Sequence, residues 1–300
     1  MSAAMATEVV PPVVDPVPVV AATVRADGIA VLTFDDPREP VNTITRELVE
    51  QLSAHLEHVA VEPSIKGAVL ASAKKDFVVG ANIDVLKAVR LASDAEAMGK
   101  GVSEALAKLA SLKKPVVAAI HGAALGGGFE IALAAHAIVA SDEATTGVGL
   151  PEVQLGLIPA ANGMLRVVER AGLQVALDLS LTGRRVRARR AKKLGLIDEV
   201  CPPSSLLDVA AQRALELAAF GAKKREGRLA HHLRTNDLAS AVLEDNALGR
   251  AILFKKAREE SRKKTRGQYP AADRIIDVLE RYGKKGFGAA AALEAKSFGE

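Results

Sequence analysis

Apolar residues recur along the chain with two spacings, and these separate the expected strands from the expected helices. Alternating or continuous apolar runs that end in turn-forming residues predict strands at residues 28–35 and 66–74. Apolar positions three and four apart predict helices at 45–63, where Thr45 can serve as the N-cap, and at 94–112. Strands that alternate with helices favour an α/β fold with crossover connections.

The pattern becomes helical in the second half of the chain. Residues 114–125 begin as a strand, and residues 129–141 read as a helix that runs into a short strand. After about residue 170 helical spacing prevails, through the segments LDLSLTG, ARRAKKLGLIDEV and LLDVAAQRALELAA. From residue 220 onward the chain is helical and basic, with a break at RGQYPAAD. We therefore expect an α/β part followed by a helical part.

Prolines interrupt the first 21 residues. Pro11, Pro12, Pro16 and Pro18 favour a flexible, partly extended N-terminal tail over residues 1–21. The segment has neither a basic beginning nor an unbroken apolar core, so it does not resemble a signal peptide. No stretch of the sequence reads as a membrane span either. We therefore expect a cytoplasmic protein, or one of an organelle matrix if the source is eukaryotic.

Composition argues against several kinds of protein. The 300 residues are 49% hydrophobic, which is enough for a sizeable core. A single cysteine, Cys201, excludes an internal disulfide and a cysteine metal cluster, and it fits a reducing compartment. The absence of tryptophan and an aromatic content of 3% argue against a stacking platform for single-stranded nucleic acid.

Positive charge gathers in the last part of the chain. The net charge is +4, and residues 221–300 hold 18 Lys and Arg against 11 Asp and Glu. A solvated helical face is the simplest explanation of this surplus. Contact with the phosphates of a cofactor or of RNA is the alternative, and nucleic acid is not the partner that we expect.

Three consecutive glycines, Gly126 to Gly128, stand inside the apolar segment HGAALGGGFE. Glycine costs a helix about 1 kcal/mol relative to alanine, so three together need a structural reason. One reason is tight packing of a helix against a strand. The other is close approach of a ligand, because the first N–H groups of a helix are unpaired and carry positive partial charge. Such groups can stabilise the oxyanion that forms when an acyl carbonyl becomes an enolate.

Another glycine-containing loop strengthens the second explanation. The segment VVGAN at 78–82 follows an expected strand and can direct the amide of Ala81 toward the same point. Two amides from two strand ends would form an oxyanion hole. Glu130, among apolar neighbours, and Glu152, in LPEVQLGLIP, can then act as base and acid at the carbons next to a thioester. A solvated surface charge is the alternative for either glutamate.

Together, AAIHGAALGGGFEIALAAH, GLPEVQLGLIP and DFVVGANI resemble the signature of the crotonase (enoyl-CoA hydratase/isomerase) superfamily, and the match extends over residues 22–205. The resemblance implies an α/β catalytic core of ββα turns wound into a spiral. It also implies that the helical, basic region over 206–300 serves oligomerisation or acts as a linker. Since proteins of this superfamily form trimers or larger oligomers, we expect a homo-oligomer, either a trimer or a hexamer.

The resemblance also assigns roles to residues. It places the oxyanion-hole amides on Ala81 and Gly127 and the catalytic glutamates on Glu130 and Glu152. In hydration of a 2-trans-enoyl-CoA during fatty-acid β-oxidation, it implies that Glu130 activates the water and that Glu152 handles the proton at the α-carbon. The acyl-CoA thioester is then the substrate, and neither a cofactor nor a metal is implied. The substrate-binding positions that the resemblance implies are Val79, Gly80, Gly126, Gly128, Pro151 and Ala160.

Two later segments, LTGRRVRARRAKKLGLIDEV and KKTRGQYPAADRIIDVLERYGKKGF, are similar to the α-subunits of multifunctional fatty-acid oxidation enzymes within this superfamily. In those proteins the hydratase part leads into an NAD-dependent dehydrogenase. The present sequence has no G-x-G-x-x-G after a strand, so we expect the hydratase part alone and no NAD site. A thiolase or a dehydrogenase is the expected protein partner.

Two departures from the superfamily pattern keep alternatives open. Where the superfamily has a glycine-rich loop, this chain has AANGM at 160–164, and Asn82 replaces the usual aspartate. These changes can narrow the site, alter the acyl length that it accepts, or weaken hydration. We therefore weigh two alternatives, a Δ3,Δ2-enoyl-CoA isomerase and a crotonase-fold scaffold that binds a thiolase or RNA.

Other chemistry-bearing residues give weaker signals. His121 and His136 lack metal-ligand spacing, so we expect them to pack structurally. Ser103 and Ser141 have no G-x-S-x-G context, and serine hydrolase chemistry is not predicted. The lysine pair at 74–75 precedes the second loop and can approach the phosphates of coenzyme A, although exposed lysines are common.

Overall fold

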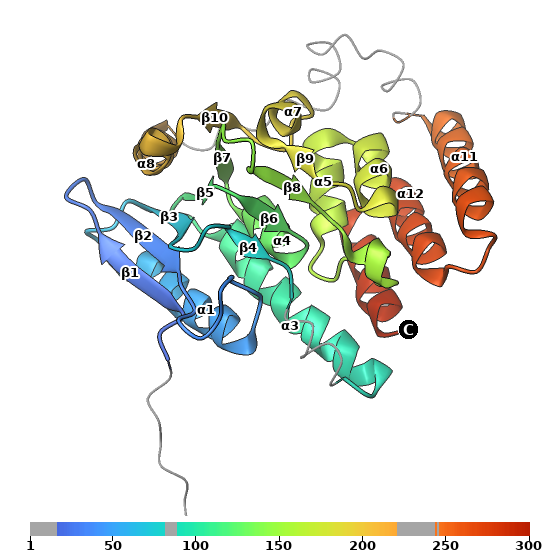
Figure 1. Cartoon of the computed structure of the whole chain (residues 1–300), viewed down its shortest axis with the longest axis horizontal. Coiled ribbons are helices and arrows are strands. Elements are labelled where there is room, and N and C mark those ends of the chain that lie inside the picture. The colour runs from blue at the N-terminus through green and yellow to red at the C-terminus, as the bar shows by residue number, and fades with distance from the viewer. Residues whose placement is uncertain (1–16, 82–88, 221–243, 245) are drawn as a thin grey trace, which may run out of the picture.

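The structure, a computed structural model, describes residues 17–81, 89–220, 244 and 246–300. The strands of this part of the chain form two mostly parallel sheets (Figure 1). The larger sheet has the order β1-β2-β3-β5-β7-β10, and the smaller has the order β4-β6-β8-β9. The strands are β1 (Val20–Val24), β2 (Ile29–Phe34), β3 (Gly67–Ser72), β4 (Val78–Val79), β5 (Val116–Ile120), β6 (Ala123–Leu125), β7 (Ala137–Ser141), β8 (Gly147–Gly149), β9 (Val186–Arg187) and β10 (Glu199–Cys201).

The chain repeats one turn of structure three times. β3, β5 and β7 lie in the larger sheet, and each is followed by a strand of the smaller sheet, β4, β6 or β8, and then by a helix or helical turn. This repeat is the ββα spiral that the superfamily resemblance implied, and a helical C-terminal region follows it. The helices are α1 (Arg46–Val61), α3 (Ala92–Ser111), α4 (Gly127–Ala134), η1 (Glu152–Leu155), α5 (Gly163–Ala171), α6 (Leu173–Thr182), α7 (Ala188–Lys193), η2 (Pro203–Ser205), α8 (Leu206–Phe220), α11 (Ala247–Thr265) and α12 (Pro270–Gly299).

Side chains of the larger sheet alternate between two buried faces, as the two-residue period of a strand requires. Val69, Val117 and Val139 face α8, which packs across one side of the sheet. The adjacent positions Leu70 and Ile138 face the main core on the other side. Because both faces are covered, these strands read as continuous apolar runs rather than as alternating ones.

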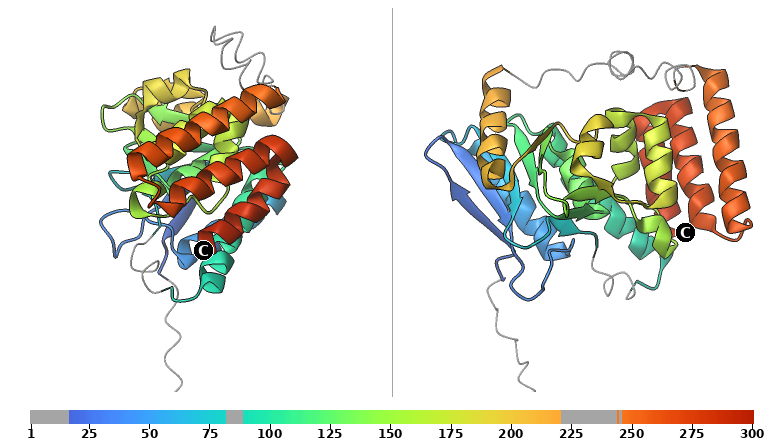
Figure 2. Two further views of the ribbon diagram at one scale, coloured as in Figure 1. Left: turned by 90° about the vertical axis from the view of Figure 1, so that its right-hand side faces the viewer. Right: turned by 45° about the horizontal axis from the view of Figure 1, so that its top comes forward.

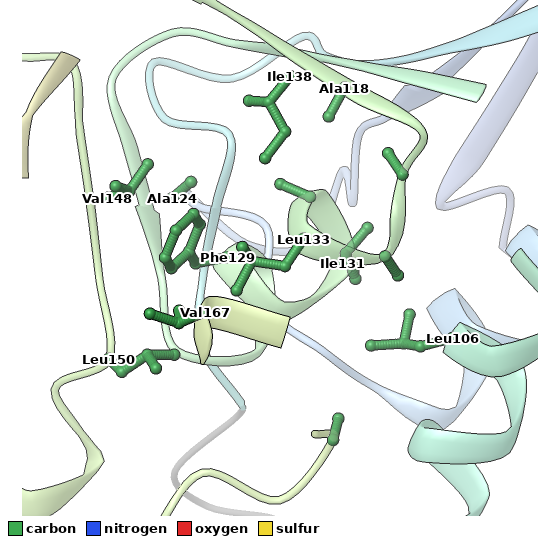
Figure 3. Close-up of a cluster of buried hydrophobic side chains, with 14 of the residues drawn as sticks. Leu106, Ala118, Ala124, Phe129, Ile131, Leu133, Ile138, Val148, Leu150 and Val167 are labelled. Atoms are coloured by element: carbon green, nitrogen blue, oxygen red, sulfur yellow. The ribbon is translucent and has the colours of Figure 1, made fainter. Parts of the chain in front are cut away.

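Helix α4 is buried around its whole circumference, which explains why its sequence is apolar on every face. Phe129, Ile131 and Leu133 are all buried. Figure 3 shows them packed with Leu106 of α3 and Val167 of α5. A polar side chain on such a helix is therefore drawn into the core together with its apolar neighbours.

The expected start of α1 is confirmed. Thr45 has extended backbone angles, and its hydroxyl accepts a hydrogen bond from the Leu48 amide at 3.1 Å. The strand predicted at 114–125, by contrast, is two strands. Gly122, with φ of 59°, separates β5 from β6, and a Cβ there would lie 2.4 Å from the carbonyl oxygen of Lys75. This tight turn moves the chain from the larger sheet to the smaller one.

Two short strands lie inside the region after residue 170 that was predicted as helical. β9 pairs antiparallel with β8, and β10 pairs parallel with β7. With 2 and 3 residues, they are shorter than the window in which an apolar period can be recognised. At the other end, β1 begins at Val20, inside the expected tail of residues 1–21, and residues 1–16 of that tail lie outside the described residues.

The C-terminal helices α11 and α12 lie together at the end of the molecule opposite the β1–β2 hairpin (Figures 1 and 2). α12 packs against α3, α5 and α6 of the α/β core. The predicted break between the two helices is present, because α11 ends at Thr265, its C-cap Arg266 has φ of 53°, and α12 begins at Pro270. The last helix therefore reaches the helices that surround the glycine turn. Residues 221–243 of the basic region lie outside the described residues.

Candidate active site

The glycine triplet forms the turn between β6 and α4. Gly126 has φ of 53°, in the left-handed region that side chains disfavour, and its amide donates to the Gly149 carbonyl at 2.9 Å. A Cβ on Gly126 would lie 2.6 Å from Oε1 of Glu152 and 3.5 Å from Cα of Gly80. The turn therefore lies against the second predicted glutamate and against the second predicted loop.

The other two glycines have different surroundings. A Cβ on Gly128 would lie 2.0 Å from the carbonyl oxygen of Val78, so close packing of α4 on β4 requires glycine there. A Cβ on Gly127 would lie 3.0 Å from the Ile44 side chain and 3.9 Å from Oε2 of Glu130. Packing thus accounts for Gly128, while the two preceding glycines border the predicted glutamates.

The direction of the Ala81 amide follows from the planarity of the peptide bond. The carbonyl of Gly80 accepts a hydrogen bond from the Ile44 amide at 2.8 Å. In a trans peptide the carbonyl and the next N–H point in opposite directions. The N–H of Ala81 therefore points away from Ile44.

The Gly127 amide lies at the N-terminal end of α4. The carbonyl of Gly126 accepts the Glu130 amide at 2.9 Å inside the helix, so the N–H of Gly127 points out of the helix end. β4 and β6 run parallel, with Val79 opposite Leu125. We infer that this register, continued two residues further, brings the two predicted donors to neighbouring positions.

Asn42 fixes the strand that leads into the second loop, although no sequence pattern singled it out. Its side chain is 1% exposed. Its Nδ2 donates to the carbonyls of Phe34 and Phe77 at 3.1 and 3.3 Å. Its Oδ1 accepts from the Asp36 amide at 3.1 Å, and its backbone carbonyl accepts from the Val79 amide at 2.9 Å. The side chain and backbone of Asn42 therefore connect the end of β2 to Phe77, which precedes β4, and to Val79, which ends it.

Helix α4 carries Glu130 into the core, where this residue is 3% exposed. Its Oε1 accepts hydrogen bonds from the amides of Ala161 and Gly163 at 2.9 and 2.8 Å. Both amides lie at the start of α5, whose positive end favours a carboxylate. Burial raises the pKa of Glu130, and the two amides and the Arg166 guanidinium oppose that rise. The pKa of Glu130 is raised overall, and the amides and the guanidinium hold it below the value that burial alone would give.

Glu152 has different surroundings at the start of η1. Its Oε2 is buried and has no hydrogen-bond partner within the described part of the chain. Burial and the negative charge of Glu130 raise the pKa of Glu152 to about 8. Two neighbouring buried carboxyls do not readily ionise together, so the proton stays on the one whose negative charge has fewer hydrogen-bond donors to stabilise it. The pair therefore suits one base, Glu130, and one acid, Glu152.

A third carboxyl and a guanidinium, both missed in the sequence, belong to the same cluster. Glu294 of α12 is 1% exposed, and its Oε1 accepts from the Asn162 amide at 2.6 Å. Arg166 interacts electrostatically with Glu130 and Glu294, and its guanidinium lies 5.8 Å from the ring centre of Phe287. In the sequence, Glu294 follows the apolar spacing of an ordinary long helix, and nothing local marks it as buried.

The remaining predicted substrate-binding positions surround this cluster. Val79 is the last residue of β4, Gly80 follows it, and Pro151 directly precedes η1. Ala160 begins the loop whose amides reach Glu130. The structure thus brings the predicted positions of the two loops and the two glutamates together. Asn82, the second departure from the superfamily pattern, lies outside the described residues.

The two histidines make structural contacts. His121 Nε2 donates to the Lys74 carbonyl at 2.7 Å, and His136 Nδ1 accepts the Val116 amide at 3.0 Å. Burial lowers the pKa of His136, which favours its neutral ring. Lys74 itself forms an ion pair with Asp35 at 2.9 Å.

The described residues contain neither a group of metal ligands nor a helix that could span a membrane. No three His, Cys, Asp or Glu side chains gather there as metal ligands. Within the same residues, no helix combines the length and apolar character needed to cross a membrane.

Known proteins resemble this chain over most of its length. Residues 25–269 match the family described as Enoyl-CoA hydratase/isomerase. The chain is 43% identical over 276 residues to a fatty acid oxidation complex subunit alpha of Shewanella amazonensis, and 42% identical over 279 residues to that of Shewanella putrefaciens. These alignments cover 92% and 93% of this chain but only 38% of each relative.

Solved structures share the fold. An enoyl-CoA hydratase of Mycobacterium tuberculosis is 30% identical, with a TM-score of 0.58, and the match covers 68% of this chain and 77% of that one. An enoyl-CoA hydratase of Bacillus anthracis has a TM-score of 0.62 over 86% of this chain and 96% of its own, and its 24% identity supports the fold alone. By its family match and by these relatives, the chain belongs to the enoyl-CoA hydratase/isomerase family.

Proposed function

We propose that this chain adds water to a 2-trans-enoyl-CoA and produces a 3-hydroxyacyl-CoA. The observation that supports this most is the pair of buried carboxyls, Glu130 and Glu152, beside the glycine turn at the start of α4. Hydration needs two proton-handling groups, because the water loses a proton and the α-carbon gains one. The two glutamates differ in their hydrogen bonds, because Glu130 accepts two backbone amides whereas Oε2 of Glu152 has no partner among the described residues, and we assign the base to Glu130 and the acid to Glu152 on this difference.

In this proposal the amides of Ala81 and Gly127 hold the carbonyl oxygen of the thioester. Negative charge grows on that oxygen as the enolate forms. Donors that are fixed in place before the reaction lower the barrier, by about 3–4 kcal/mol for one such donor. The further positions that we expect around the acyl group are Val79, Gly80, Gly126, Gly128, Pro151 and Ala160.

The proton steps follow from the two carboxyls. The carboxylate of Glu130 takes a proton from water while the water oxygen bonds to the β-carbon. The electron pair of the double bond moves toward the thioester and then accepts, at the α-carbon, the proton of Glu152. Glu130 is then protonated and Glu152 ionised, and proton exchange with water restores the starting state.

The experiment is an absorbance assay with 2-trans-enoyl-CoA substrates, from crotonyl-CoA to long acyl chains. We expect loss of the absorbance of the conjugated thioester. With oxygen-labelled water, mass spectrometry should find the label in the 3-hydroxyacyl product. A folded protein that hydrates no acyl length would contradict the proposal.

The same assay separates the alternatives. An isomerase would convert a 3-enoyl-CoA and increase the conjugated absorbance, whereas a scaffold would turn over neither substrate. Isomerisation moves one proton between two carbons and can use a single proton carrier. The presence of two buried carboxyls therefore favours hydration.

The broader setting is also a proposal. The relatives are named as subunits of a fatty acid oxidation complex, which supports a place in β-oxidation and a thiolase or dehydrogenase as partner. We infer that no cofactor is needed, because hydration moves only protons and water. Assembly into a trimer or hexamer and a location in the cytoplasm or an organelle matrix stay predictions. Analytical ultracentrifugation would measure the oligomer.

A further inference from the structure

Three consecutive backbone amides at the start of α5 point at two different carboxyls. Those of Ala161 and Gly163 donate to Oε1 of Glu130 at 2.9 and 2.8 Å. Between them, the amide of Asn162 donates to Oε1 of Glu294 at 2.6 Å. Asn162 has φ of 65°, and this left-handed residue gives the loop its change of direction. The loop is therefore held between α4 and the C-terminal helix.

A second contact fixes the same residue of the loop. Nδ2 of Asn162 donates to the hydroxyl of Ser103 on α3. α12 also packs against α3, so the two anchors of Asn162 belong to one packed unit. Any displacement of Asn162 would move the two flanking amides that hold Glu130. Glu294 therefore influences the position of Glu130 through the Asn162 amide, without a hydrogen bond between the two carboxyls.

The charges around Glu294 come from three elements. Glu130 faces it from α4, Arg166 from α5 and Glu152 from η1, while α3 contributes the hydroxyl of Ser103 through Asn162. Burial and the charge of Glu130 raise the pKa of Glu294 well above its ordinary value. Glu130, Glu152 and Glu294 interact electrostatically with one another, so they titrate as a coupled set.

We propose that Glu294 is a positioning residue for hydration, which fixes the Asn162 amide and through this loop holds the carboxylate of Glu130 in place. This role rests on the proposed function. It makes the C-terminal helix part of the working site, although the sequence expectation assigned residues 206–300 to oligomerisation or to a linker.

The first test compares Glu294→Ala with Glu294→Gln, and uses Glu259→Gln on the exposed side of α11 as control. We expect Glu294→Ala to lower kcat about 10- to 100-fold with KM little changed, because a misplaced catalytic group slows the chemical step. Glu294→Gln should restore most of kcat, since its amide oxygen can accept the same hydrogen bond. Wild-type kcat in Glu294→Ala, or equal losses in both variants, would overturn the proposal. Thermal unfolding of each variant establishes that it is folded.

The second test is the pH profile of kcat. Because its pKa is raised, Glu294 ionises only at alkaline pH, where its negative charge raises the pKa of the neighbouring carboxyls, and Glu294→Gln removes that charge. Glu294→Gln should therefore move the alkaline limb to lower pH, and Glu259→Gln should leave it in place. A profile that does not move in Glu294→Gln would contradict the coupling.

An infrared titration of the carboxyl groups keeps the two proposals separate, because it needs no turnover. A shift in the pKa of the remaining buried carboxyls, Glu130 and Glu152, in Glu294→Gln supports the coupling. This result holds even if the wild-type protein hydrates no substrate, and in that case only the proposed function fails. An unchanged titration overturns the inference about Glu294, whatever the activity of the wild-type protein.

Discussion

At the scale of single residues, two glutamates of the same chemistry have opposite surroundings. Glu130 receives two backbone N–H groups at the start of α5. Glu152 faces the charge of Glu130, and its Oε2 lacks a partner among the residues described. Because donors stabilise a carboxylate and a like charge destabilises it, one residue is prepared to accept a proton and the other to give one.

This difference predicts how stability depends on pH. The pKa of Glu152 is raised from 4.5 to about 8 in the folded protein. Between these values the native state keeps a proton that the unfolded state releases, so rising pH favours unfolding. Glu152→Gln removes that dependence. Its Tm should exceed the wild-type Tm by a few degrees near pH 8 and by less near pH 5. A difference in Tm that is the same at both pH values would contradict the assigned pKa.

Sequence could identify the two catalytic candidates because their signals are local. Glu130 stands two residues after the glycine triplet, and Glu152 lies in a recognisable motif. Glu294 and Asn42 gave no such signal. Glu294 is 132 positions away in sequence from Asn162, to which it is hydrogen-bonded. Asn42 donates to the carbonyls of Phe34, before it in the sequence, and Phe77, well after it. Such contacts form only when segments distant in the sequence come together in the folded chain, so no local sequence pattern could reveal them.

At the scale of elements, close packing of α4 on β4 determines where the site forms. The apolar circumference of α4 keeps it inside the core, and the short β4 leads directly into the second loop. Element types were predictable wherever a period extended over several residues, as in α1 and α3. β9 and β10 were not, because 2 or 3 residues inside a helical pattern contain no period of their own.

Gly128→Ala tests this packing. The added methyl carbon would lie 2.0 Å from the carbonyl oxygen of Val78, so the backbone would have to shift to make room for it. We expect destabilisation on the order of 3 kcal/mol, measured by urea unfolding. Gly101→Ala on α3 is the matched control, because no atom lies within 4 Å of its added Cβ. That variant should gain about 0.5–1 kcal/mol from helix propensity. Equal stabilities for the two variants would contradict the packing argument.

At the scale of the whole molecule, the C-terminal half completes the α/β core. α8 covers one face of the larger sheet, and α12 lies against the helices around the site (Figure 2). The buried Glu244 adds a further connection, since its carboxylate accepts the amides of Leu173 and Gln174 at 2.8 and 2.9 Å. A residue from far along the chain thus caps the N-terminus of α6.

Removing this cap should destabilise the protein without touching the proposed site. Glu244→Ala leaves two buried amides of α6 without their acceptor, at a cost of about 1–3 kcal/mol. The urea midpoint should fall while the slope of the unfolding free energy against urea stays the same. Glu259→Ala, an exposed glutamate of α11, should change stability by less than about 0.5 kcal/mol. A wild-type midpoint in Glu244→Ala would show that the cap contributes little.

The central claim is that Glu130 and Glu152 move protons in one and the same hydration step. The most direct test measures kcat/KM for crotonyl-CoA in Glu130→Gln, in Glu152→Gln and in the double variant. Each single change should lower kcat/KM by roughly 10²- to 10⁴-fold. The double variant should lose far less than the product of the two, because groups that act as a unit are not additive. Turnover at the wild-type rate in either single variant would contradict the account.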